Sequence, residues 1–214
     1  MSEEITRRRF IIAGATAAVV VGAGAGITAA IAQPAVNHPS TKIGAGMKKA
    51  LVVYGTKSGC SAGVAQRIGK TLAAKGIEVQ IAPAESAGKA ADYDAVIVGS
   101  GVRMGQWHEP ARTWVAANAE ALKANPPALF TVGMTLASEP DATDKVRAFT
   151  DTLLAETGVK PVDVGVFAGW NTGEGFSFVE RAILGAMKTP KGDFRDWAAI
   201  EAWTNQVAPQ LHVS

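Results

Sequence analysis

Six consecutive residues carry the clearest chemical signal in this chain of 214 residues: Thr56, Lys57, Ser58, Gly59, Cys60 and Ser61. They follow an apolar run, residues 50–54, and precede a pattern typical of a helix. Hydroxyl and backbone N–H groups in such a loop can donate hydrogen bonds to phosphate oxygens, and the N-terminus of the next helix adds positive potential. We therefore predict a phosphate-binding loop between a buried strand and a helix.

Two other segments of the sequence partly match common nucleotide-binding motifs. Gly63, Gly69, Lys70 and Thr71 are similar to the ATP- and GTP-binding pattern, but five residues instead of four separate the glycines, and the segment falls within a predicted helix. Residues 24–29 fit G-x-G-x-x-A, yet no acidic residue lies about 20 positions further on and no strand–helix–strand unit follows. Neither segment predicts a nucleoside triphosphate or a dinucleotide as the ligand.

Composition excludes some classes of function. Apolar residues make up 48% of the chain and charged residues 19%, which is typical of a globular protein with a core. The net charge of +2 provides no basic field for nucleic acid. Cys60 is the only cysteine, so no intramolecular disulfide can form.

The first 32 residues differ in composition from the rest of the chain. Arg7, Arg8 and Arg9 precede an apolar stretch that ends in an A-x-A pattern at residues 30–32, which predicts an export signal and resembles the twin-arginine type. The expected location is then periplasmic or otherwise extracytoplasmic. An uncleaved membrane anchor stays open as an alternative, because residues 10–32 are long enough to cross a bilayer. Residues 33–46 are rich in proline and glycine and predict a linker to a domain at 47–214.

The domain at 47–214 alternates apolar strands with helices. We predict strands over residues 49–54, 77–82, 95–99, 128–133 and 162–168. We predict helices over residues 62–74, 109–124, 140–157 and 197–211. This alternation indicates an α/β fold with a doubly wound parallel sheet, whose ligands bind beyond the carboxyl ends of the strands. The site should therefore lie among three loops: residues 56–61, 99–107 and 133–138.

These motifs together resemble a known family. Strand, Thr-x-Ser-Gly-x-Ser and helix are similar to the FMN-phosphate loop of flavodoxins. Residues 99–108 resemble the Gly-(Ala/Ser)-x-(Ile/Val)-Arg-x-Gly-x-(Tyr/Trp)-His signature of the flavodoxin-like, menaquinone-dependent protoporphyrinogen dehydrogenases. The resemblance covers residues 47–214, with an insertion at about 170–193. It implies a flavodoxin-like, five-stranded parallel sheet of order 2-1-3-4-5 with helices on both faces, and FMN as the cofactor.

By this resemblance the three loops bind FMN. The residues implied are Thr56, Lys57, Ser58, Gly59, Cys60, Ser61, Gly99, Ser100, Gly101, Val102, Trp107, Gly133, Met134 and Thr135. The three residues Gly99, Ser100 and Gly101 would let the backbone approach the flavin ring, and no metal is expected. Cys60 stands at a variable position of the pattern and is interpreted as incidental, not as a redox thiol. No aromatic residue occurs at 133–138, where many electron-carrier flavodoxins place a tyrosine, so one flavin face would be open to a bulky substrate or a quinone.

Arg103 and His108 are the candidate catalytic residues. By the resemblance, Arg103 would bind an anionic group of the substrate or stabilise the reduced flavin; alternatively, it is a surface residue paired with Asp94 or Glu109. Trp107 would stack on the flavin, or else pack at the start of a helix. His108 would relay protons near neutral pH, or else serve only as a polar residue at a helix start.

The function expected from the resemblance is that of an FMN-dependent oxidoreductase, similar to protoporphyrinogen dehydrogenase, which passes electrons to a quinone or a redox protein. An electron shuttle without its own substrate is one alternative, although such shuttles tend to be strongly acidic. A binding module that has lost the flavin is another. Protoporphyrinogen oxidation belongs to the cytoplasmic side, so a predicted export signal requires either another substrate or an anchor role for residues 10–32.

An apolar face is predicted within the insertion. It would contact a membrane or a quinone, or pack against the sheet, and its residues are Phe176, Phe178, Val179, Ile183, Leu184 and Met187.

Overall fold

The computed structural model describes residues 39–103, 105–172, 178–186 and 189–211. Its strands are β1 (Thr41–Ile43), β2 (Lys49–Gly55), β3 (Glu78–Pro83), β4 (Ala95–Arg103), β5 (Gln106–Trp107), β6 (Ala128–Gly133), β7 (Asp163–Ala168), β8 (Trp170–Asn171) and β9 (Gly192–Asp193). Its α-helices are α1 (Cys60–Ala73), α2 (Glu109–Ala117), α3 (Ala119–Ala124), α4 (Thr135–Ser138), α5 (Thr143–Thr157), α6 (Phe178–Ala186) and α7 (Trp197–Val207). Short 3-10 helices cover Ala90–Asp92 and Ala208–Leu211. The predicted export signal at 1–32 and residues 33–38 of the predicted linker lie outside the described residues.

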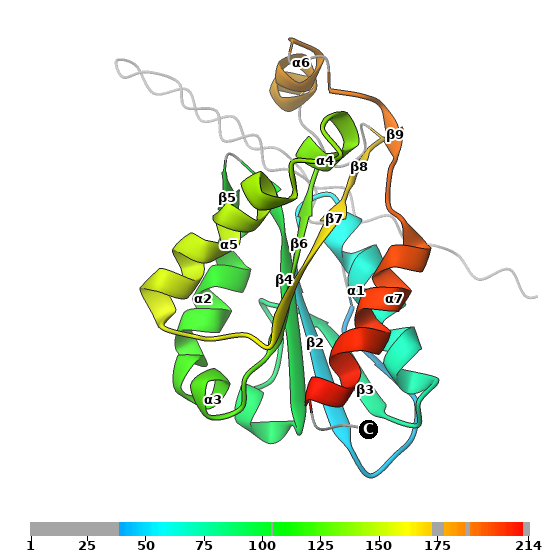
Figure 1. The fold of residues 1–214 in the computed structure, drawn as a ribbon, viewed down its shortest axis with the longest axis vertical. Coiled ribbons are helices and arrows are strands. Elements are labelled where there is room, and N and C mark those ends of the chain that lie inside the picture. Colours follow the sequence, from blue (N-terminus) through cyan, green and yellow to red (C-terminus); the bar gives the residue numbers. More distant parts are fainter. Residues whose placement is uncertain (1–38, 104, 173–177, 187–188, 212–214) are drawn as a thin grey trace, which may run out of the picture. The chain divides into compact units, whose positions relative to one another are not determined.

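The central sheet has the predicted order. Its strands lie side by side as β1-β3-β2-β4-β6-β7, and β5 pairs with β4 (Figure 1). Leaving β1 aside, the path from β3 to β7 is parallel and reads 2-1-3-4-5 when its strands are numbered along the chain. The apolar strands that predicted a sheet buried on both faces therefore form one, as their near-complete burial shows.

The predicted linker is wrong for part of its length. Thr41–Ile43 forms the edge strand β1, which runs antiparallel to β3, with Thr41 opposite Ile81 and Ile43 opposite Val79. Ser40 donates from its hydroxyl to the backbone carbonyl of Ile81 (3.3 Å). The proline- and glycine-rich composition of the segment obscured a strand whose order comes from pairing with a sheet edge, a non-local interaction.

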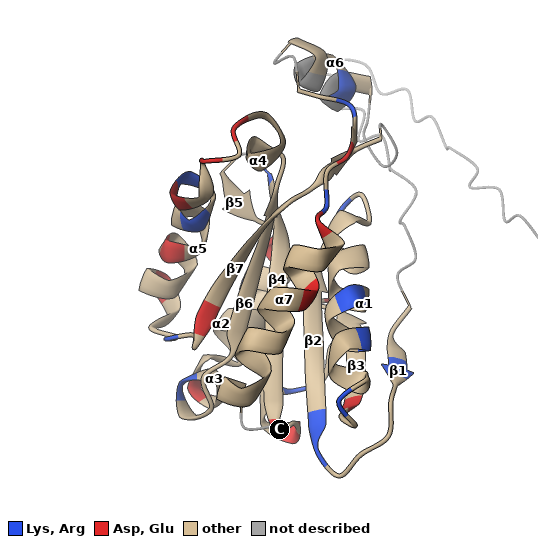
Figure 2. Ribbon diagram, turned by 45° about the vertical axis from the view of Figure 1, so that its right-hand side comes forward, with Lys and Arg blue, Asp and Glu red and all other residues tan. Residues whose placement is uncertain are grey.

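Helices cover both faces of the sheet. In Figure 1, α1 and α7 lie together on one side, while α2, α3 and α5 lie on the other. The core on the α1 and α7 side contains Ile68, Leu72 and Ile200 against strand residues such as Val52 and Ile97. The core on the opposite side contains Val115, Leu122 and Leu153 against Leu51, Val98 and Leu129. Charged residues gather on the helices and at strand ends, as Figure 2 shows.

Two predicted helices end or break earlier than their patterns suggest. The helix predicted at 109–124 divides at Asn118, whose side-chain oxygen accepts from the backbone N–H of Ala90 (2.8 Å) and whose amide donates to the carbonyl of Trp114 (2.9 Å). The backbone N–H of Asn118 is shared between the carbonyls of Trp114 (3.1 Å) and Val115 (3.2 Å), which tightens the chain between α2 and α3. The last helix ends at Val207 and tightens into a 3-10 turn, since Pro209 lacks the N–H that would continue it.

The insertion contributes a second, two-stranded sheet. Strand β8 pairs antiparallel with β9, with Trp170 opposite Asp193 and Asn171 opposite Gly192, and α6 lies between them in the chain. Phe178 at the start of α6 is 83% exposed, so this member of the predicted apolar face does not pack on the sheet. Phe176 and Met187 lie outside the described residues, and so do the side chains of Val179, Ile183 and Leu184. No helix in the described ranges is long and apolar enough to cross a membrane.

Gly99 serves packing inside the sheet. It is buried in β4, opposite Phe130 of β6, and a Cβ built on Gly99 would collide with the Phe130 ring. The Phe130 ring thus gives a packing reason for the glycine at position 99, while the approach of its backbone to a flavin ring stays a prediction. Phe130 is fully buried, and its ring packs beside Gly99 in the core.

Gly99→Ala is expected to lower the free energy of unfolding by about 1–3 kcal/mol, because the added methyl group forces an overpacked core to shift. Chemical denaturation of the full chain measures the change. Gly185→Ala in α6 is the matched control, since a Cβ there meets nothing within 4 Å. Equal stability of the two variants would contradict this account of Gly99.

Candidate functional site

The loop at residues 56–61 joins β2 to α1 and contains one left-handed residue. Gly59 has a φ of 85°, and its N–H donates to the Thr56 hydroxyl oxygen (3.0 Å). Because Thr56 Oγ1 accepts this bond, its own hydrogen remains available to another acceptor. The loop is thus folded on itself with the Thr56 hydroxyl as a donor.

The N-terminus of α1 has no capping group of its own. The first helical hydrogen bond runs from the N–H of Gly63 to the carbonyl of Gly59 (3.2 Å), so the N–H groups of Cys60, Ser61 and Ala62 precede the helical ladder. Among the described residues no side chain caps this end, and its first turn contains no acidic residue. The positive end of α1 therefore lacks an acceptor that an anion could supply.

Ser61 adds a buried donor at the same place. It is 1% exposed, and its hydroxyl has no hydrogen-bond partner among the described residues. A buried hydroxyl without a partner costs about 1–3 kcal/mol. A Cβ built on Gly101 would lie 3.1 Å from Ser61 Oγ, so the carboxyl-terminal part of β4 reaches the first turn of α1 at this hydroxyl. An acceptor placed here would recover the lost hydrogen bond.

Trp170 contacts the hydroxyl of Ser58, the remaining hydroxyl residue of the loop. Its indole N–H donates to Ser58 Oγ (3.4 Å), although the two residues are 112 positions apart in the chain. An indole can only donate, so Ser58 accepts and its own hydrogen points elsewhere. Both Thr56 and Ser58 are therefore held as acceptors by the protein, which leaves their protons for a ligand.

The second predicted loop is a β-hairpin. Arg103 at the end of β4 pairs with Gln106 of β5, and Gly105 has a φ of 77°, which turns the chain. Arg103 is exposed at the carboxyl end of the strand. Asp94 precedes the other end of β4, about 30 Å away at 3.3 Å per residue, and accepts from the backbone N–H of Lys49. The alternative pairing of Arg103 with Asp94 is therefore excluded.

Ser100 links the strand end to the next helix. It is fully buried; its hydroxyl donates to the carbonyl of Gly101 (2.9 Å) and accepts from the backbone N–H of His108 (2.8 Å). The approach of the Ser100 backbone to a flavin ring stays a prediction, whereas the Ser100 hydroxyl is used within the protein. Its role is to fix the start of α2 beside β4. Half-buried Val102 pairs with Trp107 in the hairpin.

Trp107 belongs to the core. It is 3% exposed, and its indole N–H donates to Thr131 Oγ1 (3.0 Å), which in turn shares a 2.6 Å hydrogen bond with Thr150. The prediction that Trp107 stacks on a flavin is wrong, because the ring is enclosed between β4, β6 and α5. The alternative interpretation, packing at the start of a helix, is correct.

His108 precedes α2 in a half-buried position. Its Nδ1 is buried and has no partner among the described residues. Burial lowers the pKa of His108; the carboxylates of Glu85 and Glu109 oppose this, and the positive charges of Lys57 and Arg103 add to it. The imidazole is therefore neutral at pH 7 and able to accept a proton. The first two loops lie close together at this residue, since a Cβ built on Gly55, just before the 56–61 loop, would lie 3.1 Å from the Cβ of His108.

The remaining predicted residues line the carboxyl end of β6 and the start of α1. Gly133 is buried against Val146, and half-buried Met134 and Thr135 begin the turn into α4. Burial raises the pKa of the Cys60 thiol to about 11, so it stays protonated at neutral pH. Cys60 is thus a packing residue, as interpreted from the sequence. No group of three or more acidic, histidine or cysteine side chains in the described ranges could hold a metal ion.

The family model of the flavodoxin domain matches residues 51–197. The chain belongs to the flavodoxin domain family. The observed strand order agrees with that of flavodoxins, and the structure of oxidised flavodoxin 2 from Bacillus cereus has a TM-score of 0.50 at 18% identity, covering 76% of this chain and 99% of that one. At such low identity this likeness shows the fold alone. The resemblance predicted from the two loop motifs is confirmed.

Two curated relatives of this flavodoxin-domain protein carry the same name. The protoporphyrinogen IX dehydrogenase [quinone] of Leishmania major is 28% identical over 127 residues, which is 55% of this chain and 55% of that protein. The protein of that name from Escherichia coli strain K12 is 20% identical over 171 residues, which is 75% of this chain and 94% of that protein. The alignment thus spans about half the length of the first relative.

The family implies a flavin, and the residues at α1 fit its phosphate end. Three observations agree with an anion there: the uncapped helix N-terminus, the unpaired Ser61 hydroxyl, and the two hydroxyls that the protein holds as acceptors. Trp170 is the site residue that sequence reasoning missed. The sequence signal was weak, since one tryptophan in an insertion does not reveal its contact with Ser58.

Ser61→Ala separates a ligand-binding role from a structural one. The change removes an unpaired buried hydroxyl, so the ligand-free protein should be as stable as the unmodified chain or slightly more stable. Binding of a phosphate-bearing flavin should weaken at least about ten-fold, because a hydrogen bond to a charged group contributes roughly 1.5–3 kcal/mol. Denaturation and flavin titration measure the two effects. A variant that is destabilised and binds normally would contradict this role.

His108 should make stability depend on pH. The unfolded chain binds a proton at the usual histidine pKa of about 6.5, whereas the folded protein binds it only at lower pH. The contribution of His108 is therefore fully present above about pH 6.5 and is lost as the pH falls toward the lowered pKa. Denaturation curves between pH 7.5 and 5 should show a smaller loss for His108→Gln than for the unmodified chain. Parallel curves would refute this effect of burial.

Proposed function

We propose that this flavodoxin-domain protein binds FMN and acts as an oxidoreductase of the protoporphyrinogen dehydrogenase kind, passing electrons to a quinone or a redox protein. One observation carries the proposal. The end of β2, where the 56–61 loop begins, lies against the last residue of the Arg103–His108 hairpin, since a Cβ built on Gly55 would lie 3.1 Å from the Cβ of His108. The names of the two curated relatives agree with it.

The 56–61 loop supports FMN as the flavin. Thr56, Ser58 and Ser61 offer three hydroxyl donors, and the N-terminus of α1 offers backbone N–H groups, to a phosphate monoester. A handful of such bonds holds a dianion without direct ion pairing, since each contributes roughly 1.5–3 kcal/mol. Bound FMN would supply the electron-transfer chemistry, and the protein would position it.

Arg103 and His108 have distinct proposed roles. Arg103 is an exposed cation at the carboxyl end of β4 and would bind an anionic group of the substrate, such as a carboxylate. His108 is neutral at pH 7 and would accept a proton from the substrate as electrons leave it. Its backbone N–H is fixed by Ser100 (2.8 Å), which holds the residue at the strand end.

An electron shuttle without its own substrate is the second candidate. The fold suits it, but the net charge of +2 is unlike the strongly acidic surface that steers such shuttles to basic partners. A flavin-free binding module is the third candidate. The unpaired Ser61 hydroxyl weighs against it, because a site without a ligand has no acceptor to offset that cost.

The cellular location is also a proposal. The Arg7-Arg8-Arg9 segment and the apolar run after it support twin-arginine export, or membrane association through residues 10–32. The twin-arginine route moves folded proteins, so it would let the protein acquire its flavin before export. Fractionation with N-terminal sequencing of the native protein should find residue 33 or its neighbours at the N-terminus in the exported fraction. Intact protein in the cytoplasmic fraction would contradict export, and intact protein in the membrane fraction would indicate the anchor.

The decisive test of function uses the purified full chain. It should take up FMN in a 1:1 ratio, and the loaded protein should oxidise a porphyrinogen and reduce a quinone. Arg103→Met should lower kcat/KM for the porphyrinogen at least about ten-fold, and His108→Gln about 10²–10⁴-fold, without weakening FMN binding. Exposed Arg147 on α5 provides the control variant Arg147→Met, which should behave as the unmodified chain.

Three outcomes separate the candidates. Absence of FMN uptake would reject the proposed cofactor. FMN uptake with electron transfer only to protein partners would favour the shuttle. Equal activities of the Arg103, His108 and Arg147 variants would reject the roles assigned to the hairpin.

A further inference from the structure

A nearly buried cation, Arg195, lies against the first turns of α1. The side chain of Arg195 is only 7% exposed. Its guanidinium lies directly against Gly63, where a Cβ would collide with it. Arg195 is 132 residues away from Gly63 in the chain, and the turn before α7 brings it here.

The guanidinium is fixed on three sides. Its Cζ lies 4.2 Å from the ring centroid of Trp170 and 4.4 Å from that of Trp197, which is stacking distance. Asp193 accepts from its Nε (2.8 Å) and its Nη2 (2.6 Å) in a two-point ion pair. We call Trp170, Arg195 and Trp197 the tryptophan–arginine stack.

The stack touches the 56–61 loop through Trp170. The indole N–H donates to Ser58 Oγ. Burial raises the pKa of the neighbouring Cys60 thiol, and the backbone of Trp170 is one of the groups that oppose this rise. A cation over the indole face polarises the ring and strengthens its N–H as a donor. Trp170 therefore connects a fixed positive charge to the hydroxyl whose proton would face the phosphate.

The positive end of the Arg195–Asp193 pair faces α1. The charge of Arg195 lowers the pKa of Cys60 more strongly than the charge of Asp193 raises it. Cys60 is the first residue of α1 and directly follows the loop glycine. The pair thus adds positive potential to that of the helix N-terminus.

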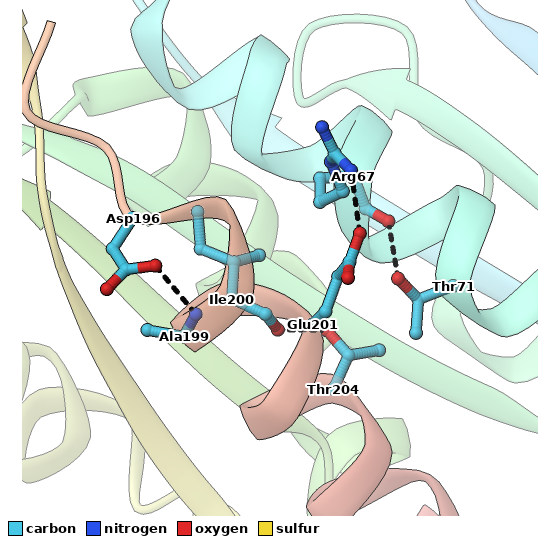
Figure 3. Close-up of polar contacts among 7 residues, drawn as sticks. All are labelled: Arg67, Thr71, Asp196, Ala199, Ile200, Glu201 and Thr204. Atoms are coloured by element: carbon cyan, nitrogen blue, oxygen red, sulfur yellow. Dashed lines mark hydrogen bonds and ion pairs between the residues drawn. The ribbon is translucent and has the colours of Figure 1, made fainter.

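The stack rests on helix packing and not on the loop itself. Figure 3 shows the contact between α1 and α7, in which Arg67 pairs with Glu201 (2.6 Å) and Asp196 caps α7 by accepting from the N–H of Ala199 (2.9 Å). Arg67 also lies over the Trp197 ring, 5.0 Å from its centroid. These contacts within α7 and between α1 and α7 hold the stack in place without a ligand.

We propose that Trp170 and Arg195 make this site selective for a phosphorylated flavin: Trp170 orients the Ser58 hydroxyl toward the phosphate, and Arg195 supplies its fixed cation. Both are positioning residues, and the inference rests on the proposed FMN binding. Riboflavin has the same ring system without the phosphate, so the ratio of FMN affinity to riboflavin affinity isolates their effect.

The first test replaces one donor at a time in the full chain. Trp170→Phe keeps a ring under Arg195 but removes the N–H that reaches Ser58, and should weaken FMN about three- to ten-fold while changing riboflavin less than about two-fold. Trp114→Phe is the matched control: it also removes one indole N–H, which donates to the carbonyl of Gly88 and reaches neither the 56–61 loop nor the stack. Its ratio of FMN affinity to riboflavin affinity should stay within about two-fold of that of the unmodified chain. In a double-mutant cycle, Trp170→Phe should no longer weaken FMN binding when Ser58→Ala is already present.

The second test removes the charge. Arg195→Met combined with Asp193→Asn takes away both charges, so no carboxylate is left without a partner. The affinity ratio should fall about ten-fold at low salt and less at high salt, because salt screens the lost potential. Unchanged riboflavin binding shows that the fold of each variant is intact.

The outcomes keep the inference apart from the proposed function. Failure of the unmodified chain to bind either flavin rejects both. Equal affinities of the unmodified chain for FMN and riboflavin, or ratios that stay within two-fold in Trp170→Phe and in the charge-free variant, overturn the inference and leave flavin binding standing.

Discussion

The N-terminus of α1 needs an acceptor that the described part of the chain does not supply. The N–H groups of its first turn precede the helical ladder, no side chain caps them, and the buried hydroxyl of Ser61 beside them is unpaired. Buried donors without partners cost free energy, and an anion at this point satisfies several of them together. The fold places this helix end directly after β2, in the middle of a parallel sheet, where the neighbouring strand ends can hold the rest of a ligand.

The other parts of the site depend on that position. Strand β4 reaches the helix end at Gly101, and its hairpin with β5 places Arg103 and His108 near the same end of the sheet. The segment around Trp170 and Arg195 approaches it from the far end of the chain and fixes a cation beside it. A phosphate at α1 would thus be shared by segments that are more than 100 residues apart, and this explains why one short motif could not describe the whole site.

Sequence reasoning predicted the features that depend on local pattern. The α/β parallel sheet and the helix after the 56–61 loop follow from the apolar runs, and the strand order follows from the family resemblance; the structure shows both. The pattern could not show that Gly99 makes room for Phe130, that Trp107 donates to Thr131 in the core, or that Thr41–Ile43 pairs with β3. Each of these depends on a partner from another element. The role of Arg195 could not be predicted for the same reason, because its guanidinium packs against Gly63 of α1, which is distant in the sequence.

The crystal structure of the full chain with FMN tests the central claim most directly. We expect the phosphate oxygens within about 3 Å of the hydroxyls of Thr56, Ser58 and Ser61, and of the first N–H groups of α1. We expect Trp170 still bonded to Ser58 and Trp107 still buried. A phosphate bound away from the 56–61 loop, with the Ser61 hydroxyl still unpaired, would contradict the account.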